Sequence, residues 1–438
     1  AMVLALVMTL SLAVSANAFK DDKSISDDYA EAVAVLNGMG VFKGYEDGSF
    51  KPEGNITRAE VATIVYRIYT ADVAKNDKSG LYATYNKFSD MAGAGWAQGY
   101  IGYCANAALV KGYPNGTFQP SGKVTGYEVL AMILRAIGYD QNNEFTGADW
   151  ALHVAQTAQQ AGVLKNVKGV DLNAPATREL VAELLFRAIA KAPMVTYTAA
   201  FGYQTVSFNG KDDNGKLFKD NETLGHKNFE LDDKADSDDW GRPATTWEYN
   251  VGDKSTTVVD KPDASFNVAT TECDICAALG IKKSADVVEI YTNGVKKGTD
   301  TLTATETKAK LGAQGQQIEF YENKDGDYRM VVIDTYLAYV NEVVEKKVDS
   351  KDHTTRDTYL ALDVYKTDDG KATTLYVKGN DYAEEDWVLV NVNDAKDVSI
   401  IRTTNKAAQT SDLVEIVAKA ESFEGVQSKI YYNVQNRN

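Results

Sequence analysis

An internal repeat decides what the first half of this chain can fold into. Three blocks share two anchors, an aromatic residue followed by alanine and, later, a threonine that opens an amphipathic pattern. The aromatic anchors are Tyr29, Trp96 and Trp150, and the threonines are Thr57, Thr125 and Thr177. An arginine follows each threonine by ten residues, at Arg67, Arg135 and Arg187. Because one such unit buries little surface alone, we expect the three units to share a core.

Each threonine is expected to begin a helix. After the first, apolar side chains recur at helical spacing, at Val61, Ile64, Val65 and Ile68. A threonine followed three residues later by glutamate is the pattern of a capping box, in which the two side chains bond the free N–H groups of the first turn. The boxes are Thr57 with Glu60 and Thr125 with Glu128, whereas Thr177 lacks the glutamate.

Arg58 and Arg178 directly follow two of these threonines, and Gly126 follows the third. The capping box does not use the arginine. The first N–H groups of a helix have no partner inside the helix. We therefore expect each arginine, together with the N–H groups beside it, to form an anion site.

A loop motif precedes the first two of these helices. It reads Lys-Gly-Tyr-x-x-Gly-x-Phe-x-Pro from Lys43 and again from Lys111. Its central Asp-Gly or Asn-Gly forms turns, and its proline stops a premature helix. The third repeat lacks this loop.

These motifs, with Phe-x-Asp at residues 19–21 and 88–90, resemble the S-layer homology domain family. The resemblance spans residues 19–192. It implies three modules in a pseudo-threefold spindle around a helical bundle. It also implies non-covalent binding of a secondary cell-wall polymer, often bearing pyruvate ketals, in grooves between modules.

Matched position by position, the resemblance implies a set of residues that bind the wall polymer. They are Arg58, Arg178, Gly44, Gly112, Asp21 and Asp90. Gly126 stands where the family has its arginine, so one groove lacks that ligand. Not all three grooves need be functional.

The expected fold is multidomain α + β, an all-α tandem followed by β-rich domains. After Pro193 the composition shifts to Thr, Val, Tyr, Asp and Gly, and alternating runs predict strands, with a hairpin turn at Asn293-Gly294. The expected segments are a signal peptide at 1–18, repeats at 19–75, 86–140 and 144–192, and β-rich domains at 195–335 and 336–438. The last of these is a candidate small barrel.

Residues 1–18 are uncharged, apolar through Val14, and end in Ala16-Asn17-Ala18, which is typical of a cleaved secretory signal. The segment begins with alanine and lacks basic residues, so we expect its N-terminal part to be missing. A membrane anchor is the rival interpretation, but a span needs about 20 apolar residues. We expect export to the cell wall and no membrane span after cleavage.

The net charge of −16 is spread unevenly. Residues 19–192 hold 17 basic and 19 acidic side chains, and residues 193–438 hold 29 and 43. Binding to nucleic acid needs concentrated Lys and Arg, so this composition excludes it. The first half can approach an anionic polymer that the second half would repel.

The cysteines and acidic clusters do not predict a cofactor. Cys273 and Cys276 form a lone CxxC, which indicates either a local disulfide or two free thiols, and Cys104 is expected to be buried. Fragments of calcium loops occur at 212–215, 325–327 and 368–370, but none completes the twelve-residue pattern. We expect neither a cofactor nor a metal.

Two hypotheses for function remain. The first is a structural surface-layer protein, held by the repeats and self-associating in a lattice. The second is an anchored polysaccharide hydrolase or a glycan-binding adhesin. Only His226 and His353 lie beyond the repeats, neither in a catalytic motif, and the acidic residues single out no carboxylate pair. We therefore favour the first hypothesis and expect no enzymatic activity.

Overall fold

A computed structural model describes residues 19–400, except 75–76, 86, 212–215, 268, 313–315, 348–355, 366–371 and 380–381. The expected signal peptide, His353, the turn at Asp369-Gly370 and the end of the chain lie outside the described residues. The described residues form two units, which we call the helical unit (19–235 and 245–258) and the sheet unit (236–244 and 259–400).

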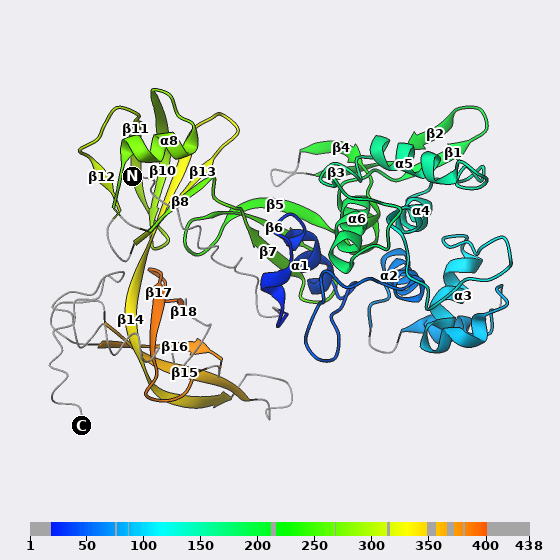
Figure 1. The fold of residues 1–438 in the computed structure, drawn as a ribbon, viewed down its shortest axis with the longest axis horizontal. Coiled ribbons are helices and arrows are strands. Elements are labelled where there is room, and N and C mark those ends of the chain that lie inside the picture. The colour runs from blue at the N-terminus through cyan, green and yellow to red at the C-terminus, as the bar shows by residue number, and fades with distance from the viewer. Residues whose placement is uncertain are drawn as a thin grey trace. The chain divides into compact units, whose positions relative to one another are not determined.

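The helical unit contains a pair of helices from each repeat (Figure 1). The pairs are α1 (Ala30–Gly38) with α2 (Arg58–Thr70), α3 (Gln98–Asn106) with α4 (Gly126–Ala136), and α5 (Trp150–Gln160) with α6 (Arg178–Ala190). Short 3-10 turns lie at η1 (Asp22–Ser24), η2 (Lys78–Tyr82) and η3 (Met91–Ala97). The first helix of each repeat packs on the second helix of the preceding repeat: α3 on α2, α5 on α4, and α1 on α6. The tandem therefore closes on itself.

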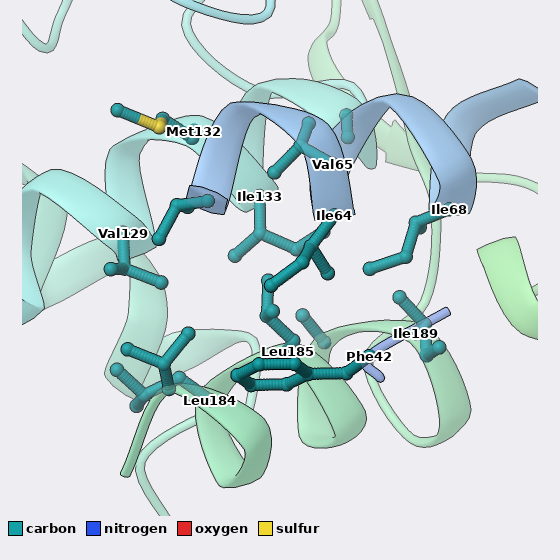
Figure 2. Close-up of a cluster of buried hydrophobic side chains, with 14 of the residues drawn as sticks. Phe42, Ile64, Val65, Ile68, Val129, Met132, Ile133, Leu184, Leu185 and Ile189 are labelled. Atoms are coloured by element: carbon teal, nitrogen blue, oxygen red, sulfur yellow. The ribbon is translucent and has the colours of Figure 1, made fainter. Parts of the chain in front are cut away.

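The second helices of the three repeats build the common core. Figure 2 shows Ile64 of α2, Ile133 of α4 and Leu185 of α6 directed toward one another. All three are at most 4% exposed and belong to one apolar cluster. The helical periodicity of the three repeats thus predicts their shared core correctly, because each stripe is buried by the other two.

The core of the helical unit continues past the repeats. The added elements are β1 (Val195–Thr198), β2 (Gly202–Thr205), β3 (Ser207–Lys211), β4 (Leu217–Asn221), α7 (Leu224–Phe229), and those parts of β5 (Asp232–Ser237), β6 (Pro243–Glu248) and β7 (Ser255–Val259) that lie within 19–235 and 245–258. Trp247 of β6 is 2% exposed, and its ring lies 5.0 Å from that of Phe186 in α6. Its Nε1 donates to Glu31 Oε1 of α1 at 2.9 Å. The structure thus groups residues 195–235 and 245–258 with the repeats, where we expected a boundary at residue 195.

The sheet unit is β-rich, as the alternating runs predict. Its elements are β8 (Ala264–Phe266), β9 (Thr270–Thr271), α8 (Glu272–Leu279), β10 (Ser284–Thr292), β11 (Val295–Thr303), β12 (Lys310–Leu311), β13 (Gln316–Glu322), β14 (Tyr328–Lys347), β15 (Arg356–Tyr365), β16 (Ala372–Lys378), β17 (Trp387–Val392) and β18 (Val398–Ile400). The turn between β10 and β11 has positive φ at Asn293 and Gly294, as a tight hairpin requires.

The long strand β14 links two cores of the sheet unit. Its first part runs beside β10 and β13, and this sheet packs with α8 around Phe320. Its second part runs between β15 and β17 around Leu362. The division expected near residue 335 thus falls within a continuous strand that has one core on each side. In the part of the chain that the structure describes, no helix is long and apolar enough to cross a membrane.

Candidate functional site

The three repeats meet in a closed ring of backbone hydrogen bonds. Its members are the residues directly before the cap threonines, Ile56, Val124 and Ala176. The Ile56 N–H donates to the Ala176 carbonyl at 3.3 Å, and the Val124 N–H to the Ile56 carbonyl at 3.2 Å. The Ala176 N–H completes the ring at the Val124 carbonyl, at 2.8 Å. Each repeat is therefore bonded to both others, the third to the first included.

The N-terminus of each second helix is closed by the next repeat around this ring. Backbone carbonyls of that repeat accept the first N–H groups of the helix. In α2 and α6 these bonds run from Arg58 to Gly122, Ala59 to Pro120, Arg178 to Gly54 and Glu179 to Pro52, with N···O distances of 2.9 to 3.1 Å. Our expectation that these N–H groups are free to bind an anion is wrong, because the neighbouring repeat already uses them.

The threonines cap their helices. Thr57 accepts the Glu60 N–H, while the Glu60 carboxylate accepts the Thr57 N–H at 2.8 Å, and Thr125 and Glu128 repeat this box. Thr177 accepts only the Leu180 N–H, at 3.4 Å. The caps thus fix where the helices begin, and so where the residues after them lie.

Arg58 lies inside the boundary between the first and second repeats, where it is 3% exposed. Its Nε donates to the Phe118 carbonyl at 2.8 Å and its Nη2 to the Lys111 carbonyl at 3.2 Å. Its Nη1 pairs with Glu128 at 2.9 Å. The rings of Tyr113 and Phe118 lie 4.6 and 4.7 Å from its guanidinium carbon. Arg58 therefore fastens the loop of the second repeat onto α2.

Arg178 does the same at the boundary between the third and first repeats. Its Nε donates to the Phe50 carbonyl at 2.7 Å and its Nη2 to the Lys43 carbonyl at 3.1 Å. Glu60 lies 3.6 Å from its Nη1, and the Tyr45 ring lies 4.4 Å from its guanidinium carbon. Burial lowers the pKa of Arg178, whereas the charges of Tyr45 and Glu60 raise it, and a guanidinium stays charged in any case.

Asp21 and Asp90 shape the two loops that hold these arginines. Each carboxylate accepts two consecutive backbone N–H groups, those of Phe50 and Lys51 at 2.7 and 2.8 Å, and those of Phe118 and Gln119 at 2.8 and 2.7 Å. Burial alone would raise the pKa of Asp90, but the two amides and the charge of Arg58 hold it below its ordinary value. The same bonds place the Phe50 and Phe118 carbonyls that accept from the arginines.

Gly44 and Gly112 are required by close packing. A Cβ at Gly44 would lie 2.5 Å from the Phe19 ring, and one at Gly112 would lie 2.6 Å from the Phe88 ring. Each glycine therefore lets the Phe-x-Asp segment lie flat against its loop. The six residues that we expected to bind the polymer thus gather in two equivalent boundaries, Arg58 with Asp90 and Gly112, and Arg178 with Asp21 and Gly44.

The third boundary, between the second and third repeats, is built differently. A Cβ on Gly126 would lie 2.6 Å from Leu172 Cδ2, and the Tyr127 N–H donates to the Leu172 carbonyl at 3.2 Å. Leu172 thus occupies the space beside the helix start, and the boundary has no arginine at this position. The ring contains two boundaries of one kind and one of another.

Lys111, Arg135 and Asp140 of the second repeat form an ionic cluster that we did not predict from the sequence. Asp140 Oδ2 lies 2.7 Å from Lys111 Nζ and 2.6 Å from Arg135 Nε, and its side chain is 1% exposed. Burial would raise the pKa of Asp140, but the two cations and the Phe145 N–H hold it below its ordinary value. The available signal was an arginine ten positions after each cap threonine, together with a lysine fourteen positions before the first two of them.

Other candidate groups are accounted for locally. Cys273 and Cys276 are free thiols in α8, and Cys104 is fully buried, as expected. His226 pairs with Glu222 at 2.7 Å. Asp325 and Asp327 lie in the turn between β13 and β14. Among the described residues, no group of three or more His, Cys, Asp or Glu side chains is arranged to hold a metal.

Comparison with protein families finds the S-layer homology domain at residues 18–62 and 87–130. These matches cover the first two repeats as far as their second helices. The third repeat lies outside the matched ranges, although α5 and α6 complete the same ring. This repeat lacks the loop motif and the box glutamate that the other two share.

Several curated proteins resemble this region. "Cell surface glycoprotein 1" of Acetivibrio thermocellus is 41% identical over 112 residues, which is 25% of this chain and 5% of that protein. "Cell surface protein" of Thermoanaerobacter kivui is 32% identical over 210 residues, 44% of this chain and 25% of that protein. "Cellulosome-anchoring protein" of Acetivibrio thermocellus is 36% identical over 119 residues, 27% and 26% of the two chains. The matches thus span about a quarter or less of these relatives.

Proposed function

Because this chain is a cell-surface protein that carries S-layer homology domains, we propose that its helical unit anchors it non-covalently to a secondary cell-wall polysaccharide. One relative is named for anchoring, and others are named as surface-layer proteins. The observation that carries the proposal is the pair of equivalent boundaries, in which the same loop, carboxylate and buried arginine recur.

In this proposal the polymer binds at those two boundaries and bears acidic substituents such as pyruvate ketals. Arg58 and Arg178 supply positive charge and hold the loops in shape, with Asp21, Asp90, Gly44 and Gly112 as their supports. Tyr45 is 36% exposed and lies over the Arg178 guanidinium, so it offers an aromatic face at the surface of its boundary. The boundary at Gly126 is not part of the site.

The proposed arrangement of the modules is a pseudo-threefold spindle. The closed ring of Ile56, Val124 and Ala176 supports it, as does the cyclic packing of first helices on second helices. Such closure places the two arginine boundaries on one folded unit, so two sites can act together on one polymer. Linked sites raise the effective affinity without any new contact.

The sheet unit is proposed to be displayed at the surface and to associate with other copies in a lattice, without enzymatic activity. Residues 236–244 and 259–438, which contain the sheet unit, carry 34 acidic and 23 basic side chains, which would keep this part away from an anionic wall. The helical unit carries 28 acidic and 23 basic side chains and is therefore closer to neutral than the sheet unit, which supports anchoring by the first and display of the second.

Sedimentation with purified cell walls tests the anchoring proposal. The full chain should sediment with walls that carry their polysaccharide and stay in solution with walls stripped of it. The double variant Tyr45→Ala/Tyr113→Ala should sediment less, whereas the control Phe201→Ala, at a residue that is 76% exposed, should sediment like the parent. Equal sedimentation with stripped and intact walls would refute the proposal.

A further inference from the structure

The first two repeats place the same three charged residues at the same spacing. Lys43, Arg67 and Asp72 of the first repeat each lie 68 positions before Lys111, Arg135 and Asp140 of the second. In the second repeat the three side chains form the ionic cluster described above, in which Asp140 bridges the two cations. If the repeats were equivalent here, Asp72 would lie between Lys43 and Arg67.

Asp72 is instead bonded elsewhere. Its Oδ2 accepts the Tyr66 hydroxyl at 3.1 Å and the Lys78 N–H at 2.8 Å. The cause is the end of the helix, since α2 continues to Thr70 whereas α4 ends two positions earlier, at Ala136. The extra residues carry Asp72 away from the place that Asp140 fills.

Arg67 lacks the hydrogen bond from Nε to a carboxylate that Arg135 and Arg187 make. The charge of Asp77 acts on Arg67 and on Lys43. The Asp77 oxygens, however, accept hydrogen bonds from Ser79 and Tyr100.

Arg67 Nη1 donates to the Val41 carbonyl at 3.2 Å, but Arg67 Nε is buried and has no hydrogen-bond partner among the described residues. In the third repeat the equivalent Arg187 donates from Nε to Glu183 at 2.8 Å. The first repeat has Thr63 at the position equivalent to Glu183, so it lacks that carboxylate. A buried unpaired donor is costly, so an acceptor oxygen that reached this nitrogen would relieve that cost.

Lys43 adds a second positive charge at the same place. Its side chain is exposed, and its Nζ donates to the Val73 carbonyl at 3.3 Å. Burial lowers the pKa of Lys43, and the positive charge of Arg67 lowers it further, while Asp77 acts in the opposite direction. The two cations are thus close enough to repel each other.

We propose that Lys43 and Arg67 bind the carboxylate of an acidic sugar, which takes the place that Asp140 holds in the second repeat. The ligand class follows from the other two repeats, where a carboxylate oxygen accepts from the equivalent Nε. The sugar as its source rests on the proposed wall anchoring. The site is separate from the Arg58 and Arg178 boundaries, since it uses the end of α2 and not its beginning.

The test is a titration of the full chain with methyl glucuronide, followed by NMR of the arginine Nε–Hε signals. We expect the Arg67 signal to shift saturably with the glucuronide and to remain in place with the neutral methyl glucoside. Lys43→Gln should weaken binding roughly tenfold, the effect of losing one charged hydrogen bond. The control Lys165→Gln, at an exposed lysine of the third repeat, should bind like the parent.

Two substitutions use the repeat symmetry. Thr63→Glu supplies the internal carboxylate of the third repeat, so it should abolish glucuronide binding. Asp140→Gly removes the carboxylate and leaves its place beside Arg135 open, so the Arg135 signal should then respond to glucuronide as Arg67 does. No shift at Arg67, an undiminished shift in Thr63→Glu, or equally tight binding of inorganic phosphate would each overturn the proposal. If the chain sediments with walls but glucuronide does not shift the Arg67 signal, this inference is wrong and the anchoring proposal stands. If glucuronide shifts the Arg67 signal but the chain does not sediment with walls, only the anchoring proposal is wrong.

Discussion

Arg178, in the last repeat, donates from Nε to the backbone carbonyl of Phe50, in the first, across 128 positions of sequence. Arg58 makes the equivalent bond to Phe118, 60 positions away. Both arginines are 3% exposed, so they join repeats whatever else they do. A ligand at these boundaries therefore meets a loop surface that the arginines have already shaped.

Arg58→Ala should destabilise the helical unit by about 3 kcal/mol, because it breaks a buried pair and leaves two carbonyls without donors. Arg58→Lys should recover only part of the loss, since lysine cannot bond three acceptors in a plane. The helical circular dichroism signal of the full chain during denaturation measures this. Lys165→Ala is the exposed control, and a midpoint for Arg58→Ala equal to that of the control would show that the buried contacts carry no stability.

The caps should differ in strength. Thr57→Ala should cost about 1 kcal/mol, as cap removals do. Thr177→Ala should cost less, because Thr177 makes a single long bond whereas Thr57 also bonds the Glu60 carboxylate. The same denaturation measurement ranks them, and an equal loss for both would contradict the role given to the box glutamate.

Asp140 should contribute to stability in a pH-dependent way. Its folded-state pKa is depressed, so its contribution is present above the unfolded-state pKa, about 4, and is lost as pH falls through the folded-state pKa. Asp140→Asn should therefore be less stable than the parent at neutral pH, and the difference should shrink below pH about 4. Stability curves that stay parallel down to acid pH would rule out this assignment.

Asp90→Asn should loosen the loop of the second repeat. The substitution replaces a carboxylate that accepts two backbone N–H groups by a neutral amide with one acceptor oxygen. Hydrogen exchange at the Phe118 and Gln119 amides should speed up, while exchange in the equivalent loop of the first repeat should not change. Unaltered protection at both amides would contradict the contact.

A chain that ends at residue 192 should be less stable than one that ends at residue 258. The longer chain retains Trp247, which packs on Phe186 and bonds Glu31. Trp247→Ala in the full chain should cost about 3–5 kcal/mol, as for other buried aromatic residues. We expected the repeats to end at residue 192 and a β-rich domain to begin at residue 195, and equal melting temperatures for the two truncated chains would favour that boundary.

Local features of the fold could be predicted from the sequence, and distant partners could not. Thr57 and Glu60 lie three positions apart, so helix geometry alone brings their side chains together. The tight turn at Asn293-Gly294 is likewise predicted by these two residues, because both readily adopt the positive φ that the turn requires. The partners of Arg58 lie far along the chain, in another repeat. Its position after a cap therefore suggested an open anion site, whereas the closed ring buries it. The hydrogen-bond partners of Asp72 depend on where α2 ends, and the end of a helix is difficult to predict from sequence.

The ring of Ile56, Val124 and Ala176 changes how this tandem can come apart. An open row of repeats has a terminal unit that contacts one neighbour only, and such rows unravel inward from that unit. Here every repeat has a neighbour on both sides, so no unit is first to fray. Tension applied to the chain beyond the repeats would have to break two boundaries before any one repeat could leave.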